Sequence, residues 1–108
     1  MAHVIEVYEV GRTTVVGFGG REPLADINLA HCRNDLVKLV REHQTQILAF
    51  DLTGVRMLPS GLLGLLASMR REGIEVHIHN ASIDVRDALR TTNLDRIMQV
   101  HEVATDDR

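Results

Sequence analysis

The segment from Asp51 to Ser60 has the residue types and spacing that best suit a functional site. A short apolar run ends at Asp51, a loop follows, and Ser60-Gly61 opens a stretch without charge as far as Met69. In open α/β sheets, binding sites form beyond the carboxyl ends of strands, where a helix N-terminus presents unpaired N–H groups and partial positive charge. A phosphate on the Ser60 hydroxyl would therefore be stabilised by the helix that this residue begins.

A simpler interpretation of the same residues stays open. Ser60 could be an ordinary N-cap, because Ser is a preferred capping residue, with Pro59 as a rigid lead-in. Gly61, Gly64 and Ser68 also form a stripe of small residues on one helical face. For Gly64 we expect close packing on a sheet, and for Gly61 we expect backbone that is exposed to a partner.

The histidines and glycines are weaker candidates for chemistry. His77 and His79 are two residues apart on one predicted strand, a spacing compatible with two metal ligands. No neighbouring Cys or carboxylate pair completes a ligand set, and His101 shows no clustering with them in sequence, so we expect a solvated sheet face and no metal site.

A catalytic triad built on Ser60 lacks the Gly-x-Ser-x-Gly elbow, because position 58 is Leu. The glycines form no dinucleotide or phosphate-loop motif.

Composition narrows the class of function. The chain has 108 residues, twelve Lys and Arg against fifteen Asp and Glu, a net charge of −3 and 3% aromatic residues, which argues against nucleic-acid binding. The single cysteine, Cys32, excludes an internal disulfide, and we expect it to be inert core. No apolar run approaches the roughly 20 residues that span a bilayer, and residues 1–7 do not resemble a signal peptide. We therefore expect no membrane insertion and a reducing, cytoplasmic setting.

The elements that position these residues follow from periodicity. We expect strands at 3–10, 13–18, 46–52, 75–79 and, weakly, 98–103, and helices at 27–43 (N-cap Asp26 or Asn28), 60–72 (ended by Gly73), 83–90 (N-cap Ser82) and a turn at 93–97. Strands that alternate with helices predict parallel neighbours joined by right-handed crossovers. The edge strand of the N-terminal hairpin could pair two copies into a homodimer, which the sequence leaves open.

Several of these segments, in this order, resemble one known family. They are Phe50-Asp51-Leu52-Thr53-Gly54-Val55, Ser60-Gly61-Leu62, Gly73 before a Val/Ile strand, Asn80 with Asp84-Val85-Arg86 and Leu89, and Thr92-Asn93-Leu94-Asp95-Arg96-Ile97. Together they resemble the STAS domain of bacterial anti-sigma factor antagonists. The resemblance implies one α/β domain over residues 1–108, with a mixed, mostly parallel sheet of about five strands and helices mainly on one side. The acidic end Asp106-Asp107 separately predicts a flexible tail over 103–108.

The same resemblance implies a function. Antagonists of this family bind an anti-sigma factor that is also a serine kinase; the kinase phosphorylates a Ser or Thr at this helix start, the phosphorylated form is released, and a phosphatase restores it. On this basis Ser60 is the expected phosphoacceptor, and the protein acts by protein–protein binding without catalysis or a cofactor. The expected partner-binding residues are Met57, Leu58, Pro59, Gly61, Leu62 and Leu63, and the supporting polar residues are Asp26, Asp51 and Thr53.

The match at the helix start is incomplete. The family motif there is Asp-Ser-Ser-Gly or Asp-Ser-Thr-Gly, so Leu58 stands at its acidic position and Pro59 at its first hydroxyl position. These departures favour a second hypothesis, a STAS scaffold subunit of a transport or stress-signalling complex that is never phosphorylated. A third hypothesis, a small enzyme or phosphate-ligand binder at the same helix N-terminus, lacks any base–nucleophile spacing.

Overall fold

The structure, a computed structural model, describes residues 5–19 and 27–101. The described elements are β1 (Glu6–Glu9), β2 (Thr13–Gly17), α1 (Leu29–His43), β3 (Ile47–Asp51), α2 (Ser60–Arg71), β4 (Glu75–His79), α3 (Ile83–Thr91), the 3-10 turn η1 (Leu94–Arg96) and β5 (Gln99–His101). Their order is the one that the sequence predicts, and β4 has the predicted bounds.

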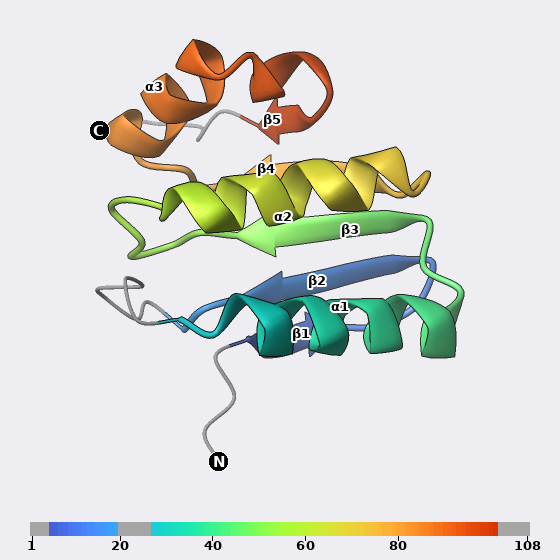
Figure 1. Cartoon of the computed structure of the whole chain (residues 1–108). Coiled ribbons are helices and arrows are strands. Elements are labelled where there is room, and N and C mark those ends of the chain that lie inside the picture. The colour runs from blue at the N-terminus through green and yellow to red at the C-terminus, as the bar shows by residue number, and fades with distance from the viewer. Residues whose placement is uncertain (1–4, 20–26, 102–108) are drawn as a thin grey trace.

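The strands form one sheet in the order β1-β2-β3-β4-β5 (Figure 1). β1 runs antiparallel to β2, whereas β2, β3, β4 and β5 are parallel to their neighbours. Gly11, with a φ of +141°, lies in the short connection of the hairpin, where a side chain would be strained. The predicted mixed, mostly parallel α/β fold is confirmed, and its parallel pairs arise because α1, α2 and α3 return the chain to the same end of the sheet.

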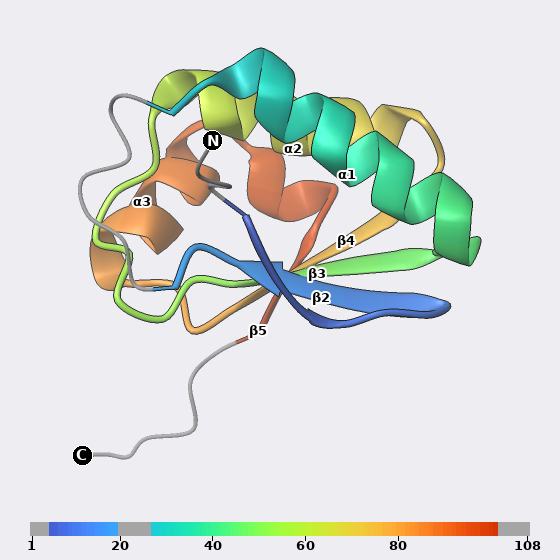
Figure 2. The same cartoon turned by 90° about the horizontal axis from the view of Figure 1, so that it is seen from below.

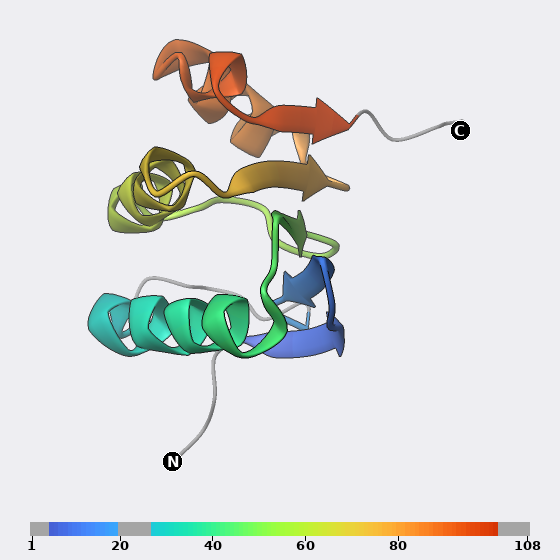
Figure 3. The same ribbon diagram turned by 90° about the vertical axis from the view of Figure 1, so that its right-hand side faces the viewer.

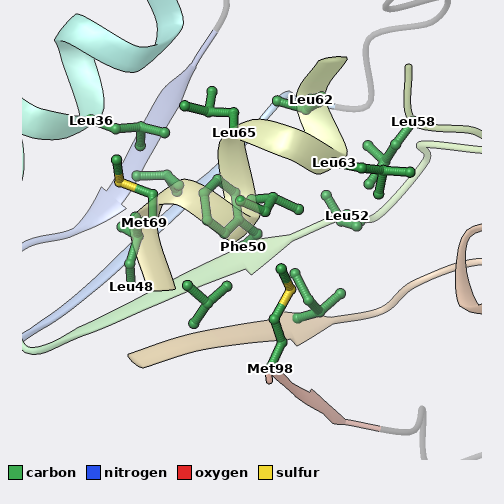
Figure 4. Close-up of a cluster of buried hydrophobic side chains, with 14 of the residues drawn as sticks. Leu36, Leu48, Phe50, Leu52, Leu58, Leu62, Leu63, Leu65, Met69 and Met98 are labelled. Carbon is green, nitrogen blue, oxygen red and sulfur yellow. The ribbon is translucent and has the colours of Figure 1, made fainter. Parts of the chain in front are cut away.

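In the part of the chain that the structure describes, α1, α2 and α3 lie on one face of the sheet and no helix lies on the other face (Figures 2 and 3). Alternate strand residues point toward the helices, so Leu48 and Phe50 of β3 and Val76 and Ile78 of β4 are almost completely buried. They pack with the apolar side of α2, including Met69, in one continuous core (Figure 4). The predicted one-sided helix layer is therefore confirmed.

The helix ends follow the capping signals in the sequence. Asn28 caps α1 by accepting a hydrogen bond from the His31 N–H at 3.0 Å, and Ser82 caps α3 by accepting one from Val85 at 3.1 Å. Gly73, with a φ of +91°, follows α2 as predicted. In the described ranges, no helix is long and apolar enough to cross a bilayer.

Some expectations differ from the structure or lie outside it. β1 begins at Glu6 rather than His3, and α1 begins at Leu29 rather than at residue 27, because the Asn28 cap fixes where the helix starts. Residues 1–4, 20–26 and 102–108 are outside the described residues. The alternative cap Asp26, which is also an expected site residue, and the expected tail over 103–108 fall in these ranges.

Candidate functional site

The loop between β3 and α2 is anchored in the core at every third residue. Leu52, Val55 and Leu58 are 1%, 2% and 5% exposed, respectively. The Val55 N–H donates to the Leu52 carbonyl at 2.9 Å, and Gly54 has a φ of +83°, the value required at the third position of a type II turn. These anchors hold the intervening residues on the surface and fix the point at which α2 begins.

The loop is also tied to the connection between β4 and α3. One carboxylate oxygen of Asp51, Oδ1, accepts hydrogen bonds from the Thr53 N–H at 3.0 Å, the Thr53 hydroxyl at 2.6 Å and the Asn80 amide at 3.0 Å. The Ser82 hydroxyl donates to the Arg56 carbonyl at 2.8 Å. The hydrogen bonds of Asp51 and Thr53 therefore fix the backbone at the strand ends.

The charge of Asp51 is stabilised by the groups that it binds. Partial burial alone would raise the pKa of its carboxyl, but the hydrogen bonds from Asn80 and Thr53 outweigh that effect and hold the pKa below its ordinary value. Asp51 is consequently ionised at neutral pH, in the state that accepts all three hydrogen bonds.

Ser60 is the first residue of α2 and is exposed. The N-cap is Pro59, which makes no side-chain capping bond, and its carbonyl accepts the N–H groups of Leu62 at 3.0 Å and Leu63 at 3.2 Å. The alternative that Ser60 is an ordinary N-cap is therefore wrong, because the residue already lies inside the helix. The first turn of α2 contains no acidic residue, so no carboxylate of this turn offsets the helix dipole at Ser60.

Three of the expected partner-binding residues do not reach the surface. Leu58, Leu62 and Leu63 are 5%, 1% and 8% exposed and point into the core beneath the start of α2 (Figure 4). The expectation that they present an apolar docking surface is corrected, since their apolar area is already covered by the protein itself. Met57, with 52% of its surface exposed, and Pro59, which is partly exposed, remain available beside Ser60.

Of the two glycines of α2, Gly61 is exposed as expected and its contact with a partner stays a prediction, whereas Gly64 differs from its expectation. A Cβ on Gly61 would lie 2.2 Å from Cδ1 of Leu29, so the start of α2 packs closely against the start of α1. A Cβ on Gly64 would meet nothing within 4 Å. The expected close packing of Gly64 is wrong. The error arises because helical spacing shows which residues share a face but not what lies opposite that face. Ser68 donates its hydroxyl to the Leu65 carbonyl at 2.7 Å.

A second group of polar side chains lies on the sheet face opposite the helices, where the structure adds His101 to the predicted pair His77 and His79. His101 of β5 is paired in register with His79 of β4. The rings of His79 and His101 stack at 4.2 Å between centroids, and His101 Nε2 lies 2.9 Å from His77 Nδ1. Burial, followed by the neighbouring imidazoles, holds the pKa of His79 below its ordinary value despite the opposing effect of Asp51. The expectation that His101 stands apart is therefore corrected.

The comparisons with known proteins agree with this architecture. A family model described as the STAS domain matches residues 5–106. Among solved structures, the anti-sigma factor antagonist SpoIIAA in its unphosphorylated form superposes with a TM-score of 0.75 at 16% identity, covering 91% of this chain and 88% of that chain. No curated protein matches the sequence. With the family model spanning nearly the whole chain and the same fold in SpoIIAA, this protein belongs to the STAS domain family.

Proposed function

We propose that this protein is an anti-sigma factor antagonist-like regulator that binds an anti-sigma factor with serine kinase activity, and that phosphorylation of Ser60 switches the binding. The observation that carries the proposal is that Ser60 is an exposed hydroxyl at the first position of α2. STAS family membership and the fold shared with an anti-sigma factor antagonist support the class of partner.

The modification requires little of this chain beyond presenting Ser60. The Ser60 Oγ attacks the γ-phosphorus of ATP held by the kinase; the new O–P bond forms as the bond to the β,γ-bridging oxygen breaks and ADP leaves. The hydroxyl proton passes to a base on the kinase. The phosphate that results lies near the first N–H groups of α2, which intrahelical hydrogen bonds leave unpaired and which favour an anion.

The departure at Leu58 has a structural explanation. Its side chain is a core anchor of the loop, 5% exposed, so this position serves packing instead of presenting a carboxylate. Pro59, with a φ of −60° and a ψ of 148°, sets the extended backbone that leads directly into the helix. The loop thus presents Ser60 as the hydroxyl of the motif without help from an adjacent acid.

Phosphorylation would act on binding through charge and desolvation. A phosphoserine adds about −1.5 to −2 charge at pH 7, and placing it in an interface beside Met57 and Pro59 costs desolvation and repels acidic partner groups. A loss of about 2–3 kcal/mol would weaken binding roughly 30- to 150-fold. The unmodified protein is therefore the binding form, and the modified protein is the released form.

The decisive experiment combines modification with binding. The protein is incubated with candidate anti-sigma factor kinases of its host and ATP, and the modified residue is located by mass spectrometry. Ser60→Ala is expected to abolish phosphorylation and keep binding, whereas Ser60→Asp is expected to weaken binding. We do not expect the hydroxyls of Ser82, which is half-buried, or Thr53, which is exposed, to be modified in place of Ser60, because both are engaged in hydrogen bonds. No modification at Ser60, together with unchanged binding by Ser60→Asp, would refute the switch.

The burial of Leu58 and the presence of Pro59 favour a second candidate, a STAS scaffold subunit of a transport or stress-signalling complex that is not phosphorylated. In that case the surface around Met57 and Ser60 still contacts a partner, but no kinase acts on it. Binding to transporter or stress-complex components that is insensitive to Ser60→Asp, with no transfer of phosphate from ATP, would distinguish this function from the first.

A further inference from the structure

We propose that His77, His79 and His101 form a binding site for one divalent transition-metal ion of the zinc type, on the face of the sheet that carries no helix. Each imidazole offers one ligand nitrogen, and the three nitrogens lie within 4.8 Å of one another. Among the described residues this is the group of potential metal ligands that the structure brings together. The site does not involve Ser60 and is independent of the proposed phosphorylation.

The sheet itself creates the cluster. His77 and His79 are two residues apart on β4 and so point to the same face, and the parallel register places His101 of β5 directly beside His79. Leu48 and Phe50 of the neighbouring strand point to the opposite, helix-covered face, and the residue of that strand paired with His77 is the small Ala49. His77 and His79 are partly buried and His101 is exposed, so an ion can enter from solvent.

A carboxylate orients one of the ligands. Glu75 Oε2 lies 2.6 Å from Nε2 of His77, and the Gln99 amide donates to the same carboxylate oxygen at 3.2 Å. When Nε2 of His77 donates to Glu75, its Nδ1 carries the lone pair, and it is Nδ1 that faces His101. A carboxylate on the far nitrogen of a ligating histidine is the usual way in which proteins fix the tautomer and raise the basicity of that ligand.

Binding requires a local rotation of a ring and a proton shift. The rings of His79 and His101 stack with an interplanar angle of 4°, so one of them has to turn before the in-plane lone pairs of both point to the same ion. With His77 in the tautomer that donates to Glu75, the 2.9 Å contact between His101 Nε2 and His77 Nδ1 is made by a proton on His101 Nε2. A metal ion between the two rings replaces that proton, which moves to Nδ1 of His101, so the pair stays neutral. Three imidazoles with an open fourth position for water match a tetrahedral zinc-type site, and nitrogen donors favour Zn²⁺, Co²⁺, Ni²⁺ and Cu²⁺ over Mg²⁺ and Ca²⁺.

Isothermal titration of the tag-free, chelator-treated protein with ZnCl₂ tests the proposal. The expected result is one bound equivalent, with no heat from MgCl₂ under the same conditions. Glu75→Gln keeps all three imidazoles and is expected to weaken Zn²⁺ binding about tenfold, the effect typical of removing an outer carboxylate. His79→Gln and His101→Gln remove a ligand and are expected to weaken binding more than Glu75→Gln does. Co²⁺ is expected to give the visible absorption bands of a tetrahedral site.

His31→Gln is the matched control, because His31 is an exposed histidine on α1, on the other side of the sheet. It is expected to bind Zn²⁺ like the wild type. Hydrogen exchange gives a readout that does not depend on heats of binding: Zn²⁺ should slow exchange of the β5 amides, since the ion links β5 to β4, and should not do so in His101→Gln. Absence of Zn²⁺ binding by the wild type would overturn the proposal. So would wild-type affinity for Zn²⁺ in the folded variants His79→Gln and His101→Gln.

Discussion

Ser60→Asp should stabilise the fold while weakening partner binding, and the opposite signs of these two effects make it an informative substitution. The first turn of α2 has no acidic residue, whereas its last turn carries Arg70 and Arg71. Charged side chains therefore offset the helix dipole only at the C-terminal end of α2. A carboxylate at the first helical position interacts favourably with the dipole and is expected to raise the free energy of unfolding by about 0.3–1 kcal/mol. The side chain at position 60 is exposed, so no core contact is lost.

The same carboxylate imitates part of the charge of a phosphate at the binding surface. Because it carries about one unit of charge against about −1.5 to −2 for phosphoserine, its effect on binding should be smaller than that of the modification. We expect the affinity of Ser60→Asp for the kinase partner to fall by roughly tenfold or more, which corresponds to about 1.4 kcal/mol.

Urea unfolding at low and high salt measures the first effect, and titration calorimetry with the partner measures the second. The stabilisation should shrink as salt screens the dipole, whereas Ser60→Ala should show neither the stabilisation nor the loss of affinity. If Ser60→Asp destabilises the protein, residue 60 does not lie at an open helix N-terminus. If its stability rises but its affinity is unchanged, the fold is as described and the phosphorylation switch is refuted.

Four further outcomes follow from the structure. Gly64→Ala should raise the free energy of unfolding by about 0.5–1 kcal/mol in thermal or urea unfolding, because the added methyl meets open space inside a helix. Burial raises the pKa of the Cys32 thiol to about 12, so native protein at pH 8 should react with a thiol reagent far more slowly than protein in denaturant. Asp51→Asn should lower stability at pH 7, and its difference from wild type should vanish as pH falls through the lowered pKa of Asp51, since the stability from that charge is present only above this range. Met57→Ala should weaken partner binding, as measured by calorimetry, without lowering stability, whereas Ile83→Ala, at a residue 68% exposed on α3, should change neither.

The order of elements could be predicted because local signals and packing agree along most of the chain. Asn28 and Ser82 cap the helices that their sequence positions suggested, and Gly73 takes the positive φ that ends α2. These signals act over a few residues and need no knowledge of the rest of the fold. The weak last strand was also predicted in kind: within the expected range 98–103, β5 is described over Gln99–His101.

The candidate site was predictable in position but not in its exposed surface. That Ser60 begins α2 follows from the sequence, because an uncharged helical run has to start after Pro59. Whether Leu58 and Leu62 face a partner or the core depends on where the loop meets the sheet, which is a long-range property. The His77–His101 contact likewise depends on the register between two parallel strands, and no residue in either strand specifies that register alone.

The packing of Gly61 changes which residues form the surface around Ser60. Because Leu29 lies where a side chain at position 61 would be, the start of α1 is in contact with the start of α2. Leu29 is 36% exposed and Met57 is 52% exposed, so apolar area flanks the helix start from two different elements even though Leu62 and Leu63 are buried. A partner that binds the surface around Ser60 would contact the start of α1 and the β3–α2 loop at the same time. A phosphate there would act on both contacts, which gives a single modification a larger effect on affinity than the loss of one loop contact would have.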